Sequence, residues 1–266
     1  MRNILCVTLI ALLGGCTSTS VTEKYQDKRN DIINVKDKVI EFETGNVLIG
    51  SVSRLYMSNK CLLIADHKSV DKQIHIFNKN DFSYLTSIGN FGEGPEEITV
   101  MGCLAIDEAH HQLYVSDHAK QKIFSYDMDS VMVDSLYKPQ VKTAMNETLF
   151  PSEYQYINDT LSIAVLIKPT STSTFNQFLG RWNMNTGEMI PMKYTHPDIQ
   201  KKRITFAASE KAGIYVECYT RHDLMTICSL DGELLYNIYG PDWDGGNGNK
   251  LQSLSLIHIS EPTRRS

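Results

Sequence analysis

Two stretches decide the fold of this chain: CLLIADHKSVDKQIHIFNKNDFSYLTSIG (residues 61–89) and HQLYVSDHAKQKIFSYDMDSVMVDSLY (residues 111–137). Each begins with a β-rich run that ends in aspartate, Asp66 in the first stretch and Asp117 in the second. Each then continues with a polar loop, an apolar run, a turn and another extended run. The two aspartates are 51 residues apart, and a repeat of this length is typical of stacked structural modules.

Weaker copies of the same unit follow. They comprise LSIAVLI with FLGRWNMNTGEMIPM (residues 161–167 and 178–192) and GIYVECY with LMTICSLDGELLYNIYG (residues 213–219 and 224–240). The turns that we predict between the last two strands of each unit hold residues that tolerate tight hairpins. These turns are Asn80–Asp81, Asp129–Ser130, Asn185–Gly187 and Asp231–Gly232.

The second unit shows how many strands a repeat contains. Four short extended runs rich in β-branched and aromatic residues are predicted there, at residues 103–106, 112–116, 122–126 and 131–137. A four-stranded antiparallel unit at this period is a propeller blade, and blades must pack face to face to bury both faces. The predicted fold class is therefore all-β, a β-propeller of four-stranded blades. The alternative is a plain β-sandwich with coincidental spacing.

Four segments resemble known propeller families. Leu104–Asp107, LYVSD (residues 113–117) and KIFSYD (residues 122–127) resemble the NHL repeat. IGNFGEGPEEI (residues 88–98) resembles the junction between blades in bacterial six-bladed, TolB-like propeller lipoproteins. This resemblance implies a six-bladed ring of which residues 35–253 supply only about four to five blades. It also implies that residues 35–50 are a strand that completes the last blade.

The N-terminus predicts export and lipidation. Residues 1–15 contain an early Arg2 and a short apolar run, the order of a signal peptide. Leu13-Gly14-Gly15-Cys16 resembles a lipobox, so we expect Cys16 to carry lipid; the alternative is an ordinary signal peptide with a chance cysteine. Residues 16–34 are then a lipidated N-terminus and polar tether, flexible as far as about Lys28. The expected location is the bacterial cell envelope, on a membrane outside the cytoplasm.

The last residues look foreign to the chain. LSLIHISEPTRRS (residues 254–266) continues no strand pattern, and its first eleven residues can be encoded by a transposon-end adapter used to prepare sequencing libraries. We interpret this tail as non-native and exclude it from the fold. The natural protein is therefore expected to continue past Ser253.

Composition and cysteines exclude some function classes. The formal net charge is −5, so nucleic-acid binding through phosphate neutralisation is disfavoured. Cys61, Cys103, Cys218 and Cys228 show no zinc-ligand spacing and lie in apolar runs, which predicts buried free thiols. A disulfide between Cys218 and Cys228, on neighbouring strands of one hairpin, is the alternative.

Two groups of residues are candidate sites. The glycine-rich junction lacks phosphate-loop spacing and precedes no helix; we predict a tight inter-blade crossing built by Gly89, Gly92, Gly94, Pro95, Glu96 and Glu97. Glu96 and Glu97 are candidates to lie near the axis and meet a cation. The pairs Asp66–His67 and Asp117–His118 are weak metal candidates. The interpretation that we favour is that each aspartate accepts backbone N–H bonds from the following loop.

No compact catalytic motif is present, so a non-catalytic binding propeller is the leading functional hypothesis. Its partners are a membrane, through the lipid anchor, and an envelope protein, peptide or glycan. One rival is a metal-dependent hydrolase or lactonase with an axial cation, for which calcium is the cofactor to consider; otherwise no cofactor is expected. The other rival is a structural subunit of an envelope complex.

Overall fold

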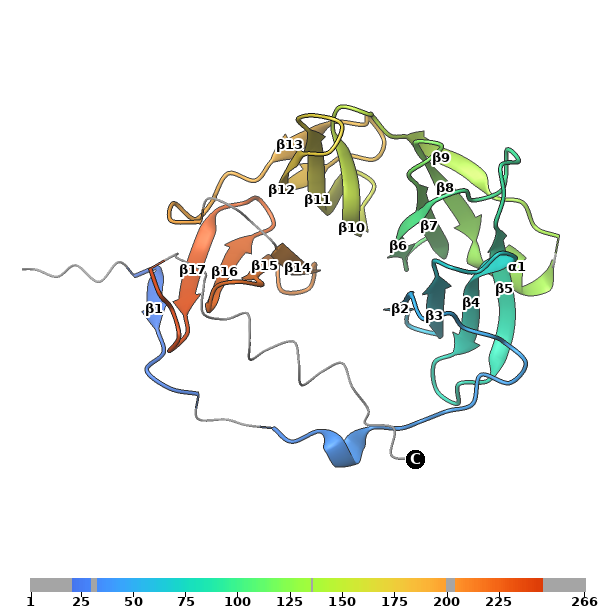
Figure 1. Cartoon of the computed structure of the whole chain (residues 1–266), viewed down its shortest axis with the longest axis horizontal. Helices are drawn as coiled ribbons and strands as arrows, with labels where there is room; N and C mark the ends of the chain where they lie inside the picture. Colours follow the sequence, from blue (N-terminus) through green and yellow to red (C-terminus); the bar gives the residue numbers. More distant parts are fainter. Residues whose placement is uncertain (1–20, 30–32, 135, 200–203, 246–266) are drawn as a thin grey trace, which may run out of the picture.

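The strands of this chain form separate sheets around a common centre. A computed structural model of the chain describes residues 21–29, 33–134, 136–199 and 204–245. In these ranges three sheets have four strands and one has five. Figure 1 shows the sheets as an open arc, with the strands at residues 53–57, 101–107, 150–158 and 204–209 nearest the centre. This arrangement is a β-propeller, as the repeat predicts, and it rules out the single sandwich.

The first two sheets follow the two strong repeats. Blade I contains β2 (Ser53–Met57), β3 (Cys61–Asp66), β4 (Lys72–Asn78) and β5 (Tyr84–Asn90). Blade II contains β6 (Met101–Asp107), β7 (Gln112–Asp117), β8 (Lys122–Asp127) and β9 (Gln140–Ala144), with helix α1 (Met128–Val133) between β8 and β9. Within each blade, successive strands pair antiparallel.

The other two sheets follow the weaker repeats. Blade III contains β10 (Phe150–Asn158), β11 (Leu161–Pro169), β12 (Phe175–Trp182) and β13 (Met189–Pro191). Blade IV contains β14 (Ile204–Ser209), β15 (Ile214–Tyr219), β16 (Leu224–Ser229) and β17 (Leu234–Tyr239). A short N-terminal strand, β1 (Glu23–Tyr25), adds to β17 in parallel as the fifth strand of this sheet.

The core consists of layers between blades rather than one central cluster. In β3, Leu63 and Ala65 face blade II, whereas Leu62 and Ile64 belong to a cluster on the opposite face. In β7, Leu113 packs toward blade I and Tyr114 toward blade III. Because neighbouring side chains of a strand point to opposite faces, a blade between two others needs apolar residues on both.

Side chains of the inner strands also join neighbouring blades. The Cys103 thiol of β6 lies 3.4 Å from both the backbone nitrogen and the carbonyl oxygen of Tyr154 in β10. The Gln155 side chain of β10 binds the carbonyl oxygen of Ala208 in β14 at 2.7 Å and its backbone nitrogen at 2.8 Å. Through these hydrogen bonds, a side chain of one inner strand binds both backbone groups of a residue in the next blade's inner strand. They link blade II to blade III and blade III to blade IV.

The outer strand of blade II differs from the prediction. Residues 131–137 were expected as the fourth strand, but Met128–Val133 is helical and Gln140–Ala144 pairs with β8 instead. The Asp127 carboxylate accepts a hydrogen bond from the Ser130 backbone nitrogen at 2.7 Å, which caps the helix. Asp129–Ser130 is therefore part of a helix and not a hairpin turn. The turns predicted at Asn80–Asp81, Asn185–Gly187 and Asp231–Gly232 do lie between the last two strands of their blades.

Residues 35–50 also differ from the prediction. They form no strand, and their only regular element is the short 3-10 helix η1 (Lys36–Lys38). Phe42 stacks on Phe82 with ring centroids 4.5 Å apart, and Val47 and Ile49 pack on the face of blade I that points away from blade II. The physical reason is that this face has no neighbouring blade in the described arc, and the segment covers its apolar residues.

The predicted tether is partly ordered. Glu23–Tyr25, which we expected in a flexible segment, is the strand that pairs with β17. Residues 1–15, which we predict to be a signal peptide, lie outside the described residues, as do Cys16 and residues 254–266. Among the described residues, no helix is both long enough and apolar enough to cross a membrane.

Candidate functional site

The predicted site residues lie at one end of the blades, which we call the Asp–His end. Strands β3 and β7 finish there, and the turns at residues 67–71, 91–100 and 118–121 cover it. The opposite end, with the turns at residues 58–60, 79–83 and 108–111, we call the cleft end.

Asp66 and Asp117 each accept hydrogen bonds from backbone N–H groups at the Asp–His end, as we predicted. Asp66 accepts hydrogen bonds from the backbone nitrogens of Gly50 at 2.7 Å and Lys68 at 2.9 Å. Asp117 accepts four, from Thr99, Val100, Ala119 and Lys120. Burial raises the pKa of Asp66, but its backbone N–H bonds outweigh burial and hold that pKa below the ordinary value.

His67 and His118 contact the next blade rather than a common site. His67 Nδ1 lies 3.1 Å from the Met101 carbonyl oxygen at the start of β6. The His118 ring packs edge-on against Phe150 at the start of β10, and burial lowers its pKa. No group of three or more His, Cys, Asp or Glu side chains arranged for a metal ion is found in the described ranges. The two Asp–His pairs are therefore placed at the seams between blades.

The glycine-rich junction is a tight crossing between blades I and II. Gly89 has φ +73°, a conformation that side chains rarely adopt. A Cβ atom at Gly92 would come 2.0 Å from Glu97 Oε2, and one at Gly94 would come 2.9 Å from it. The Glu97 carboxylate accepts the Gly94 backbone N–H at 2.8 Å, which explains why this acid needs glycines around it.

Two lysine side chains of the chain itself contact this junction. The Lys120 ammonium donates to the carbonyl oxygens of Gly94 and Glu97 at 2.6 Å each, and reaches that of Gly92 at 3.4 Å. Glu96, which we expected near the axis, instead pairs with Lys138 at 2.7 Å. Lys138 lies just before the outer strand β9, so Glu96 is at the periphery of the propeller. The expectation of an axial position was wrong for this residue.

A candidate ligand site lies at the cleft end, between blades I and II. A cleft of about 470 Å³ opens there. Leu63 and Leu113, both fully buried, lie at its bottom. The remaining apolar lining comes from Cys61, Leu85, Ile106, Met128 and Met132, and the polar lining includes Lys60, Asn78, Glu108, His111 and Asp129. An apolar interior with a few polar groups around it is the usual composition of a ligand site.

Helix α1 supplies one wall of the cleft. Met128 and Met132 line the cleft, and Val131, three residues after Met128 on the same side of the helix, is buried in the core between blades I and II. The His111 ring nitrogen lies 2.8 Å from the Asp129 carboxylate, which ties the helix to the β6–β7 turn. Glu108 in the same turn accepts the Asn59 backbone N–H of blade I at 2.7 Å. The cleft is thus held by contacts from both blades.

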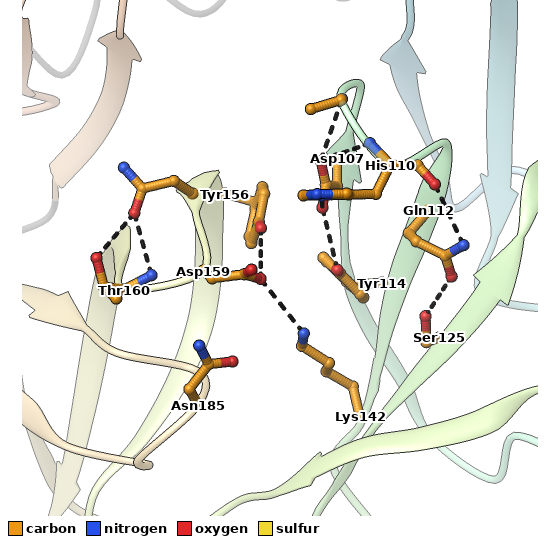
Figure 2. Close-up of polar contacts among 12 residues, drawn as sticks. Asp107, His110, Gln112, Tyr114, Ser125, Lys142, Tyr156, Asp159, Thr160 and Asn185 are labelled. Carbon is orange, nitrogen blue, oxygen red and sulfur yellow. Dashed lines mark hydrogen bonds and ion pairs between the residues drawn. The ribbon is translucent and has the colours of Figure 1, made fainter.

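A polar cluster adjoins the cleft on the other side of the β6–β7 turn. Figure 2 shows Asp107 and Asp159 facing the seam between blades II and III, each hydrogen-bonded to a tyrosine hydroxyl. Tyr114 donates to Asp107 at 3.2 Å, and Tyr156 donates to Asp159 at 2.9 Å. The bond from Tyr156 lowers the pKa of Asp159, and the bond to Asp107 raises the pKa of exposed His110. These contacts satisfy the cluster internally.

A second hollow lies along the inner strands. This axial groove has a volume of about 700 Å³ and is lined mainly by β2, β6 and β10, with the ion pair Arg54–Glu153 at 2.8 Å. Burial raises the pKa of Tyr56 to about 12 and that of Cys103 to about 11, so neither group ionises at neutral pH. In the described arc, inner strands surround only part of this groove (Figure 1).

The cysteines are free thiols. Cys61, Cys103 and Cys228 are buried and Cys218 is half-buried, without a disulfide among these four. Cys218 pairs with Met225 across the β15–β16 ladder, whereas Cys228 pairs with Tyr215. Residues 215 and 218 point to opposite faces of β15, which explains why the proposed Cys218–Cys228 bond does not form.

The cleft residues escaped prediction for two reasons. The sequence assigns no role to His110 or His111, and it predicts a turn at Asp129–Ser130 and a strand at residues 131–137 where the structure has helix α1. The available signal was Asp127 followed three residues later by Ser130, a possible helix start, but a cap alone does not place a helix against another blade.

The fold and the sequence repeat together define a β-propeller. A family model, DUF5128, described as a 6-bladed beta-propeller, matches residues 17–219. This match spans most of the chain, and the chain belongs to that family.

Solved structures that resemble this chain share little sequence identity with it. A DUF4221 family member from Bacteroides vulgatus is 12% identical with a TM-score of 0.51, over 68% of this chain and 56% of that one. A putative exported protein from Bacteroides fragilis is 14% identical (TM-score 0.49, 82% and 59% covered). An auxiliary nutrient binding protein from Bacteroides ovatus is 12% identical (TM-score 0.45, 71% and 47% covered). The chain therefore spans less than two thirds of each structure. No curated protein matches it significantly.

Proposed function

We propose that this chain is a lipid-anchored propeller of the bacterial cell envelope that binds a ligand without catalysing a reaction. The ligand enters the cleft between blades I and II. The observation that carries this proposal is the cleft itself: about 470 Å³ of space with fully buried leucines at its bottom and charged groups around it. This volume falls within the range of small-molecule sites.

Two further parts of the proposal rest on sequence. The signal-peptide pattern and Leu13–Cys16 support export and lipidation, and the repeat pattern supports kinship with TolB-like and NHL propellers. Because the family is six-bladed, we also propose that the natural protein supplies blades beyond the four described.

The cleft lining narrows the ligand class. Of the envelope protein, peptide or glycan partners expected from sequence, the apolar interior favours an apolar side chain of a protein or peptide over a glycan. Met128 and Met132 on the α1 wall suit this role because methionine side chains adapt to irregular apolar groups.

A matched pair of charge substitutions tests the cleft. Met132 lines it and is 37% exposed, whereas the next residue, Val133, is 87% exposed and does not line it. The dye 1-anilinonaphthalene-8-sulfonate, an apolar ring system that carries an anionic sulfonate, serves as the probe in a fluorescence titration. Met132→Glu places a negative charge on the cleft lining, which opposes both the apolar rings and the sulfonate, and is expected to weaken probe binding about tenfold, which corresponds to about 1.4 kcal/mol. Val133→Glu is expected to leave probe binding unchanged.

Equal binding to the wild type and both variants would place the probe elsewhere and contradict the cleft as the site. Metal analysis of the purified natural protein addresses the rival function. One tightly held calcium ion per chain, lost together with hydrolysis of a lactone on chelation, would replace the binding proposal with the hydrolase.

A further inference from the structure

Strand β1 is held on blade IV by side-chain hydrogen bonds as well as by backbone pairing; we call this set of contacts the clamp. The Glu23 carboxylate accepts hydrogen bonds from the Asn237 side-chain amide at 3.1 Å and from the Tyr239 hydroxyl at 2.5 Å. In the backbone, Asn237 N–H donates to the Thr22 carbonyl oxygen at 2.8 Å. The docked segment thus begins at Thr22, close to the start of the chain.

The clamp continues past β1. Tyr25 stacks on Tyr239 with ring centroids 4.5 Å apart, and the backbone N–H of Gln26 donates to the Tyr239 carbonyl oxygen at 2.9 Å. Arg29 pairs with Asp223 of blade IV at 2.6 Å. Contacts therefore recur from Thr22 to Arg29, along the segment that we had expected to be a flexible tether.

This docking shortens the distance between the anchor and the propeller. Six residue steps separate Cys16 from Thr22, and a fully extended chain of that length spans only about 20 Å. Whatever conformation those residues adopt, Thr22 at the outer edge of blade IV cannot lie farther than that from a lipidated Cys16.

The same edge carries side chains suited to a membrane surface. Val21 is 80% exposed, Tyr25 67% and Tyr236 42%. The Lys24 ammonium lies 5.7 Å from the centre of the Tyr236 ring. Aromatic rings with polar tips favour the interface between lipid and water, and lysine is attracted to anionic headgroups.

We infer that, in the lipidated protein, the outer edge of blade IV lies against the membrane surface through the membrane-edge patch Val21, Lys24, Tyr25 and Tyr236. This inference rests on the proposed lipidation of Cys16. Figure 1 shows β1 and β17 on the opposite side of the arc from blades I and II. The cleft is consequently held away from the membrane, where an envelope partner has access to it.

Hydroxyl-radical footprinting of the full lipidated chain tests the orientation. The chain is reconstituted in phosphatidylethanolamine–phosphatidylglycerol liposomes and compared with the unlipidated Cys16→Ser chain in solution. Oxidation of Tyr25 and Tyr236 is expected to fall about threefold or more on liposomes, because headgroups cover them. Tyr84 in blade I is 48% exposed and serves as the internal control, with no change expected.

A released variant separates docking from anchoring. Glu23→Ala removes the carboxylate that joins β1 to Asn237 and Tyr239, and leaves the four antiparallel strands of blade IV in place. It is expected to float with liposomes but to lose the protection of Tyr236. Glu43→Ala, an exposed glutamate outside the clamp, is expected to behave like the wild type.

The two proposals fail differently. If the Cys16 chain does not float with liposomes more than Cys16→Ser, lipidation fails and the membrane orientation fails with it. If the chain floats but Tyr25 and Tyr236 stay as reactive as in solution, the orientation is overturned and the lipid anchor stands.

Discussion

Asp66 and Asp117 occupy equivalent positions in blades I and II, and each binds backbone N–H groups on both sides of its strand. At the residue scale, this shared role explains why aspartate recurs after 51 residues. A buried carboxylate that accepts several N–H bonds is stabilised in its charged form. Repeating chemistry of this kind marks a structural position more readily than a catalytic one.

The depressed pKa of Asp66 predicts a pH-dependent contribution to stability. Its ionised form stabilises the fold above the unfolded-state pKa of about 4, and this contribution is lost as pH falls through the lower folded-state pKa. We expect Asp66→Asn to lower the free energy of unfolding by about 1–2 kcal/mol at pH 7. The difference from wild type should shrink at pH 3.

Urea denaturation at both pH values provides the measurement. Asp71→Asn, an exposed aspartate in the same loop, is the matched control and should change little at either pH. A difference for Asp66→Asn that is as large at pH 3 as at pH 7 would contradict the assigned role.

At the element scale, helix α1 is the main departure from the repeat. Residues 131–133 are apolar and β-branched in part, so a short run of this kind fits a strand as well as a helix. The Asp127 cap and the burial of Val131 between blades favour the helix over a strand at these residues. The cap is visible in the sequence, but the contact with blade I is not.

The Asp127 cap is also expected to affect probe binding in the cleft, because it stabilises the helix that forms one wall. The hydrogen bond from Ser130 lowers the pKa of Asp127, in keeping with a carboxylate that caps a helix. Asp127→Ala should lower stability by about 1 kcal/mol and weaken probe binding, because the Met128 and Met132 wall loosens. The readouts are urea denaturation and the dye titration.

Asp129→Ala serves as the control for this element. Asp129 is 74% exposed and pairs with exposed His111, and such pairs contribute little. If Asp129→Ala cost as much stability as Asp127→Ala, the helix would not depend on its cap.

At the scale of the whole molecule, the blade array follows from sequence whereas the placement of the site does not. Period, turn residues and apolar strands predict four-stranded modules, and the inter-blade clusters confirm how they pack. The cleft needs residues from two blades, such as Leu63 and Met132, which lie far apart in sequence. Likewise, the sequence of residues 22–29 does not predict a contact with a residue as distant along the chain as Tyr239.

The central functional claim is that the ligand binds at the cleft end, between blades I and II. The most direct test is NMR of the chain labelled with ¹³C at its methionine methyl groups, during titration with 1-anilinonaphthalene-8-sulfonate or a partner peptide. Met128 and Met132 line the cleft, Met57 lines the axial groove and Met101 lies at the Asp–His end. We predict that the signals of Met128 and Met132 shift and those of Met57 and Met101 do not. Shifts of Met57 or Met101 with Met128 and Met132 unmoved would contradict the account.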